Sequence, residues 1–373
     1  VGNIIRYINY GFYVVFPAVG FLLVYLVKKY VIRKEVSHGI PSILYAVAKQ
    51  KGIMKRFQAY GSLLTAPITI GFGGSVGLEG PMVVTGAGIS SQIARLFHIN
   101  QSDRMLLLAC ACAAALAAIF KVPLAGILFA IEVFGLDLTL WSLLPLFVAS
   151  LSGVLISYLF FGNAALLPIQ VSGSFLMRNI PFYLLLGVVG GFMSAYFTFV
   201  YEWVNRFFAR FSSPYVRLLI GGAVLGLLVF LMPPLYGEGH EVINHLKEGH
   251  PELSLGDNIF GWDLHNPWVI ILLLAGLAFS KVVATSVTFG AGGVGGIFSP
   301  MLFMGGVMGN CFARIINQIE WLPHKLPLAN FTLIGMTALM TGVLHAPLTA
   351  IFLIAEVTGG YALFVPAMVT AVI

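Results

Sequence analysis

Long apolar segments follow one another along almost the whole chain, and only short polar breaks separate them. A helix needs about 20 apolar residues to cross the hydrocarbon core of a bilayer. Charged residues make up 9% of the chain, whereas soluble domains carry roughly 25%. A soluble enzyme, a nucleic-acid-binding protein and a disordered scaffold are therefore excluded, and the expected fold class is an all-α integral membrane protein with several spans. The apolar segments are 11–27, 81–97, 105–133, 141–161, 183–203, 216–235, 267–289, 301–319, 329–356 and 361–373.

Glycine and proline interrupt many of these segments. The chain contains 42 Gly and 18 Pro, and the apolar run 105–133 is too long for one straight span. Irregular backbone at membrane depth persists only where it is buried in protein or lines an aqueous cavity. We therefore expect the broken helix ends to line a pathway through the membrane.

Positive charge is concentrated near the start of the chain. Nine of the 20 Lys and Arg residues fall within the first 56 positions. Short loops rich in Lys and Arg stay on the cytoplasmic side, so residues 28–56 are predicted to be cytoplasmic. The chain begins at Val1 and stops within an apolar run at Ile373, and we expect both ends to be incomplete. The three cysteines, in apolar surroundings, are expected to be small buried residues. They are Cys110, Cys112 and Cys311.

An internal repeat links the two halves of the chain. At an offset of 219 residues, GFGGSVGLEGPM (71–82) matches GAGGVGGIFSPM (290–301). At an offset of 224 residues, KVPLAGILFAIEVFG (121–135) matches HAPLTAIFLIAEVTG (345–359). These matches predict one transmembrane domain, 1–373, built from a first repeat of about 1–165 and a second of about 180–373. Transporters commonly bind their substrate where such repeats meet, whether the repeats are parallel or inverted.

Three short motifs place a Gly-rich break just before a proline at the start of an apolar helix. They are SHGIP (37–41), GLEGP (77–81) and GGIFSP (295–300). Proline is well placed in a first helical turn, and glycine lets the backbone approach a ligand closely. Each motif presents unpaired N–H groups and the positive end of a helix dipole, which together attract anions. The motifs contain no basic side chain, so binding would be weak and shared among several points, as conduction requires.

As a set, these motifs resemble the CLC family of chloride channels and transporters, as do the segments PLAGILFAIE and PLTAIFLIAE and the late aromatic Tyr361. The resemblance covers essentially the whole chain. It implies a CLC-type fold of many tilted and broken helices in two inverted-topology repeats, and a homodimer with one anion pathway in each subunit. It also implies chloride bound at the membrane midplane by helix N-termini. The implied anion-binding residues are Ser37, His38, Gly39, Ile40, Leu78, Glu79, Gly80, Ile297, Phe298 and Tyr361.

The resemblance also suggests how these residues divide. The backbone N–H groups of Ile297 and Phe298 and the hydroxyl of Tyr361 would bind a central chloride. The N–H groups of Leu78, Glu79 and Gly80 would line an outer site.

Glu79 is the leading candidate for function. An ionisable group within a membrane segment is a functional candidate by default, and this one lies inside a proposed anion-binding turn. A carboxylate there can occupy the anion site itself, and protonation would release it. By resemblance, Glu79 is the gating glutamate, which competes with chloride and exchanges protons with the outside. The alternative is an acidic residue that only stabilises a helix N-terminus.

The chain departs from the family pattern at two places. The family usually reads GSGIP at the first motif, whereas this chain has Ser37 and His38 at the Gly and Ser positions, which leaves the choice of anion open. Proton-coupled members carry an internal glutamate at the position of Val133. Glu132 is one residue away, about 100° around a helix, and its repeat counterpart Glu356 suggests a structural role for both.

Val133 favours a passive, glutamate-gated chloride channel as the function. The alternative is a chloride/proton antiporter of the same family, which Glu79 favours. The expected partners are chloride or similar small anions, protons in the antiporter alternative, and the lipid bilayer. No nucleic acid and no cofactor is expected, and the expected location is a bacterial inner membrane.

Three other patterns carry less weight. Residues 73–77 fit the G-x-S-x-G pattern of hydrolases, but that motif needs a preceding strand and a His–Asp pair, so an intramembrane hydrolase is a remote alternative and no enzyme is expected. Residues 290–295 fit G-x-G-x-x-G without a βαβ context. Four histidines lie in the polar stretch 236–267, which predicts a solvated loop without a metal site.

Overall fold

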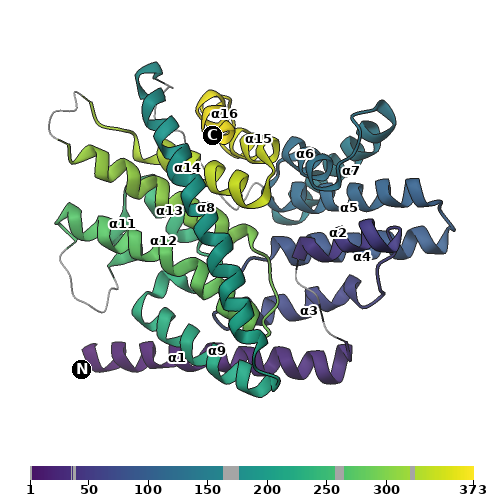
Figure 1. Ribbon diagram of the computed structural model, residues 1–373, viewed down its shortest axis with the longest axis horizontal. Coiled ribbons are helices and arrows are strands. Elements are labelled where there is room, and N and C mark those ends of the chain that lie inside the picture. The colour runs from purple at the N-terminus through teal and green to yellow at the C-terminus, as the bar shows by residue number, and fades with distance from the viewer. Residues whose placement is uncertain (1, 35, 37–38, 163–175, 257–263, 320–323) are drawn as a thin grey trace.

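The computed structural model describes residues 2–34, 36, 39–162, 176–256, 264–319 and 324–373. Within these residues the chain folds into α-helices, and the only β-type pairing is one isolated bridge. Figure 1 shows the helices stacked in layers, with α1 and α9 side by side at one edge. The helices are α1 (Gly2–Leu26), α2 (Gly39–Gln50), α3 (Gln58–Gly71), α4 (Glu79–Leu96), α5 (Gln101–Phe120), α6 (Pro123–Phe134), α7 (Leu140–Phe161), α8 (Ile180–Ala209), α9 (Pro214–Leu231), α10 (His240–Glu248), α11 (Pro251–Leu255), α12 (Pro267–Gly290), α13 (Phe298–Asn317), α14 (Leu328–Leu344), α15 (Pro347–Val357) and α16 (Phe364–Val372).

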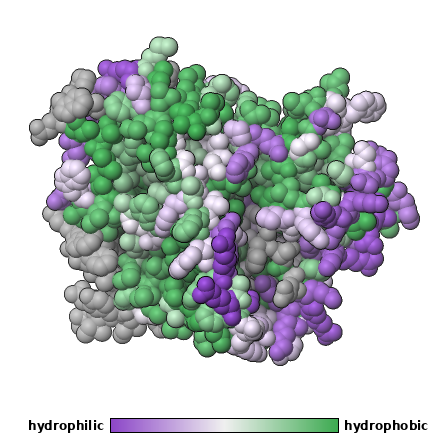
Figure 2. Space-filling view, viewed as in Figure 1, coloured by the Kyte–Doolittle hydropathy of each residue, from purple (hydrophilic) through white to green (hydrophobic). Residues whose placement is uncertain are grey.

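Six helical segments of the described chain are long and apolar enough to cross a bilayer. Hydrophobic residues also cover much of the molecular surface in Figure 2, where a soluble protein would carry charge. The chain is therefore an integral, multi-pass membrane protein. The six segments are Val14–Ile32, Gln101–Phe120, Leu140–Phe161, Met177–Ala209, Pro214–Leu231 and Pro267–Gly290.

The two longest apolar runs of the sequence each break into two helices. Lys121 separates α5 from α6, and His345 separates α14 from α15. Both residues adopt the left-handed backbone conformation, with φ of 60° and 56°. In each case a proline lies two residues further on and starts the next helix, because proline cannot continue the interior of the previous one. The breaks lie 224 residues apart, the offset at which the sequence repeats.

Two glutamates bind α6 and α15 to each other in a reciprocal way. The carboxylate of Glu132, near the end of α6, accepts hydrogen bonds of 2.8 Å from the N–H groups of Leu348 and Thr349 at the start of α15. The carboxylate of Glu356, near the end of α15, accepts bonds of 3.0 and 2.8 Å from the N–H groups at 124 and 125 at the start of α6. Each carboxylate satisfies N–H groups that a helix leaves unpaired at its N-terminus. The predicted structural role of both residues is confirmed.

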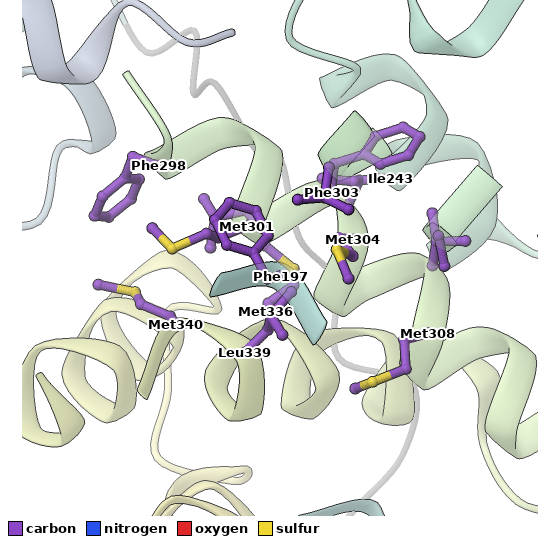
Figure 3. Packing of buried hydrophobic residues seen from close by; sticks show 14 of the residues in the cluster. Phe197, Ile243, Phe298, Met301, Phe303, Met304, Met308, Met336, Leu339 and Met340 are labelled. Atoms are coloured by element: carbon purple, nitrogen blue, oxygen red, sulfur yellow. The ribbon is translucent and has the colours of Figure 1, made fainter. Parts of the chain in front are cut away.

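A methionine-rich core fixes the position of α13 against α14. Figure 3 shows Met301 and Met304 of α13 close to Met336 of α14, with Phe197 of α8 beside them. All four side chains are buried. Unbranched methionine fills irregular gaps between helices, so this packing holds the N-terminal end of α13 in place.

Candidate functional site

The starts of α4 and α13 are joined by backbone hydrogen bonds between the two Gly-rich turns. The N–H of Gly77 donates to the carbonyl of Gly296 at 2.9 Å, and the N–H of Gly296 donates to the carbonyl of Gly77 at 2.8 Å. These residues are equivalent at the 219-residue offset of the repeat. A reciprocal exchange between equivalent residues places the local symmetry axis between them, and both helix N-termini lie beside it.

Two threonines hold the turns from the sides, again in equivalent positions. The N–H of Ser75 donates to the Thr288 hydroxyl at 3.2 Å, and the N–H of Val294 donates to the Thr69 hydroxyl at 3.0 Å. Each turn is therefore anchored on the helix that precedes the other turn. This arrangement leaves the positions of α4 and α13 strongly constrained.

The start of α2 reaches the same place. A Cβ atom added to Gly80 would lie 2.9 Å from the Cα of Gly296 and 3.6 Å from the Cα of Gly39. The first contact is closer than real Cβ atoms tolerate, so only glycine fits at this position. Three helix N-termini thus converge on one point inside the membrane domain, and together they form an environment that favours an anion.

The Glu79 side chain occupies this environment. It is 2% exposed, and its Oε1 accepts a hydrogen bond from the hydroxyl of Ser299 in the first turn of α13. The other oxygen, Oε2, has no hydrogen-bond partner in the described part of the chain. A side chain at Gly77 would meet this carboxylate and would come within 2.6 Å of the Ser299 hydroxyl. The absence of a side chain there makes room for the carboxylate.

Glu238, in the loop before α10, and His240, the first residue of α10, lie next to the Glu79 carboxylate. Glu238 Oε1 accepts a 2.8 Å hydrogen bond from the N–H of Leu78. His240 Nε2 lies 3.5 Å from Glu238 Oε2, 3.6 Å from Glu79 Oε1 and 3.2 Å from the Ser299 hydroxyl. The N–H of Leu78, predicted to bind an anion, therefore already holds a carboxylate.

Lys281 of α12 contacts the backbone of this loop. Its side chain is fully buried, and Nζ donates to the carbonyl of Gly237 at 2.9 Å and to that of Leu235 at 3.5 Å. The ammonium group also lies 4.6 Å from the centre of the Phe303 ring, a cation–π contact. Lys281 thus lies against the backbone of the loop that carries Glu238.

The structure brings together most of the sequence-predicted residues. Gly39 and Ile40 begin α2, and Leu78, Glu79 and Gly80 stand where α4 begins. Ile297 precedes α13 and Phe298 opens it. Ser37 and His38 lie outside the described residues.

Tyr361 does not join this group. It is 65% exposed, in the turn between α15 and α16, and its ring packs edge-on against Phe364. In this structure Tyr361 is therefore not enclosed together with the other predicted anion-binding residues.

The polar stretch 236–267 was predicted to be a solvated loop, and this is wrong at its beginning. His240 is only 9% exposed and opens α10. Glu238, His240, Lys281 and Ser299 all contribute to the site and were missed. Lys281 carried a usable signal, because a single charge inside a long apolar run is a functional candidate.

Val133 and Glu132 lie away from this cluster, on α6. Val133 is partly buried against the main hydrophobic core. Both oxygens of Glu132 accept hydrogen bonds from the start of α15. Glu132 therefore does not replace the carboxylate that Val133 lacks.

Comparison with known proteins identifies the family. The model of the voltage gated chloride channel family matches residues 19–373. The chain belongs to this family. Members of the voltage gated chloride channel (CLC) family are transporters or channels, so anion transport is the general activity.

Relatives of the CLC family match over most of the chain. A putative chloride channel protein, ClcB-like, from Ralstonia nicotianae is 28% identical over 369 residues, which are 95% of this chain and 80% of the relative. The fold resembles that of a slow cyanobacterial Cl−/H+ antiporter, with a TM-score of 0.79, 22% identity, and coverage of 97% of this chain and 82% of the other. It also resembles a CLC-type fluoride/proton antiporter, with a TM-score of 0.74, 22% identity, and coverage of 95% and 83%. The CLC fold with its inverted repeats is thereby established.

Proposed function

We propose that the protein exchanges chloride for protons across the membrane, with Glu79 as the group that both blocks the anion pathway and carries the proton. The observation that carries the proposal is the position of the Glu79 carboxylate where α2, α4 and α13 begin. An ionised carboxylate held there occupies the position that a permeant anion would take. Once protonated it loses its charge, and a permeant anion can take its place.

Two observations support exchange over passive flow. The solved proteins that share this fold include a Cl−/H+ antiporter and a fluoride/proton antiporter. In addition, Glu79 lies beside His240, which in turn lies beside Glu238, so two further protonatable side chains adjoin the gating carboxylate. These neighbours offer a route by which a proton reaches Glu79 from one side.

A passive chloride channel is the second candidate, and Val133 favours it. A valine cannot carry a proton, and both carboxylate oxygens of Glu132 accept hydrogen bonds from the start of α15. The relative from Ralstonia nicotianae is also described as a putative chloride channel protein. In this case Glu79 would act only as a gate.

The deciding experiment measures chloride and proton movement together in liposomes that hold a chloride gradient. Antiport predicts that the chloride gradient drives protons uphill and that the proton flux stops when chloride is absent. Chloride flux without proton movement would refute antiport and support the channel. We further propose a homodimer in a bacterial inner membrane, with a separate anion pathway in each subunit.

A further inference from the structure

Three side chains of the kinds that bind metals converge from different segments of the fold. Glu79 stands at the start of α4, Glu238 in the loop after α9, and His240 at the start of α10. One ligand atom from each lies within 4.8 Å of the others. We propose that they form an inhibitory binding site for a divalent transition-metal ion, with Zn²⁺ as the best match. The inhibitory effect rests on the proposed role of Glu79 as the gate.

The distances suit zinc. Zinc binds carboxylate oxygen and imidazole nitrogen at about 2.0–2.2 Å in tetrahedral sites, which places neighbouring ligand atoms about 3.3 Å apart. His240 Nε2 lies 3.6 Å from Glu79 Oε1 and 3.5 Å from Glu238 Oε2. Three protein ligands leave a fourth position for water or an anion. The two carboxylate ligand atoms lie within 4.8 Å of each other, and they would move together to close the site around an ion.

Neighbouring groups orient the two carboxylates. Glu238 Oε1 accepts a hydrogen bond from the N–H of Leu78, which leaves Oε2 turned toward His240. Glu79 Oε1 accepts a hydrogen bond from Ser299. Outer contacts of this kind fix the ligands of established metal sites.

The site also contains an unpartnered buried oxygen. Glu79 is 2% exposed, and its Oε2 has no hydrogen-bond partner in the described structure. Leaving a buried polar atom of a charged group unpaired is costly. A cation bound to the Glu79 carboxylate would compensate the negative charge on this oxygen as well.

Charge and access favour a cation as well. The cluster contains two carboxylates and one imidazole, and it keeps negative charge when the imidazole is neutral, even with the buried Lys281 side chain beside the loop. Glu79 and Glu238 both line a cavity of about 1060 Å³, whose other walls are mainly apolar side chains of α4, α5 and α7 together with Lys121. The Glu238 side chain is 20% exposed, so an ion can reach the site by way of this residue.

A bound ion would connect the gate to the loop that covers it. Glu79 would be held against Glu238 and His240 and could neither take a proton nor leave the anion pathway. Zinc should therefore stop anion transport without unfolding the protein.

Chloride efflux from proteoliposomes provides the first test. The liposomes are stripped of metal with EDTA, and zinc sulfate is then added outside. We expect zinc to block efflux and EDTA to restore it. His240→Gln and Glu238→Gln should each raise the half-blocking zinc concentration by about tenfold or more, measured against each variant's own flux without metal. His245→Gln is the matched control, because His245 lies on the same helix and contacts Ser254 instead. Unchanged zinc block in His240→Gln would overturn the proposal.

A second measurement does not depend on transport. Co²⁺ bound by a tetrahedral site of oxygen and nitrogen ligands gives a visible absorption band, and zinc should displace it. We expect this band in the purified wild type and in His245→Gln, and its loss in His240→Gln. If the band is present but the protein moves no anion, the metal site stands and the proposed function fails. If wild-type protein gives neither the band nor zinc block, the metal site is refuted.

Discussion

At the residue scale, the chemistry of the site depends on a single carboxylate in a position suited to an anion. Glu79 is enclosed by protein, and its environment includes one hydroxyl donor, one imidazole and a second carboxylate. In the described structure its direct basic neighbour is the His240 imidazole, and no lysine or arginine forms an ion pair with it. Its negative charge is stabilised mainly by helix N-termini and hydrogen bonds, which a chloride ion can use equally well.

Glu79→Gln should separate anion movement from proton movement. The amide keeps the size of the side chain but can carry no proton and holds no charge that competes with chloride. We expect chloride flux to continue and proton flux to fall to that of protein-free liposomes, both recorded in the same vesicles. Glu241→Gln is the control, because Glu241 is exposed on α10, and it should behave as wild type. Proton flux that persists in Glu79→Gln would show that another group carries the proton.

The sequence predicted part of this site and missed part of it for a physical reason. Glu79 and the glycines beside it lie in one short motif, so local rules about helix starts were sufficient to find them. Glu238 and His240 come to Glu79 from about 160 residues away along the chain. Their local sequence is polar and glycine-containing, which is typical of a surface loop, and only tertiary packing buries His240.

At the element scale, the two helices α6 and α15 depend on each other. Near the end of each helix lies a glutamate, and its carboxylate accepts hydrogen bonds from the N–H groups at the start of the other helix. The repeat was visible in the sequence, and so was the shared Glu. The reciprocal geometry was not, because sequence similarity alone does not say whether two halves are parallel or inverted.

Glu132→Gln and Glu356→Gln should destabilise the protein to a similar extent. An amide accepts from one N–H group but presents its own NH₂ to the other, so one charged hydrogen bond is lost and one donor is left unpaired. We expect a loss of about 1–3 kcal/mol for each, seen as a lower melting temperature in detergent. Glu202→Gln, which removes an exposed ion pair with Arg206 on α8, should cost about 0–1 kcal/mol. Equal melting temperatures for all three variants would contradict a role of these carboxylates in stability.

At the scale of the whole molecule, the topology follows from the charged N-terminal region and one long helix. Residues 28–56 are predicted to be cytoplasmic. Lys28 donates a 2.8 Å hydrogen bond to the carbonyl of Gly292, just beyond the end of α12. Because α12 is long enough to cross the membrane, its beginning and the preceding α11 should face the opposite side.

Cysteine labelling can test this orientation. The three native cysteines are buried, at 0–7% exposure, so background labelling should be low. Lys49→Cys and Glu252→Cys place a thiol at exposed positions on α2 and α11. A membrane-impermeant maleimide should label Glu252→Cys in intact cells, and Lys49→Cys only after the membrane is opened. Labelling of both from outside would refute the orientation.

The reciprocal closure of α6 and α15 also has a consequence for biosynthesis. The ribosome synthesises α6 long before it synthesises Glu356. The N–H groups at the start of α6 therefore enter the membrane without their hydrogen-bond acceptor. The first half should therefore remain incompletely assembled, and exposed to quality-control proteases, until the second half has been inserted. Two separately expressed halves would then accumulate only when both are made in the same cell.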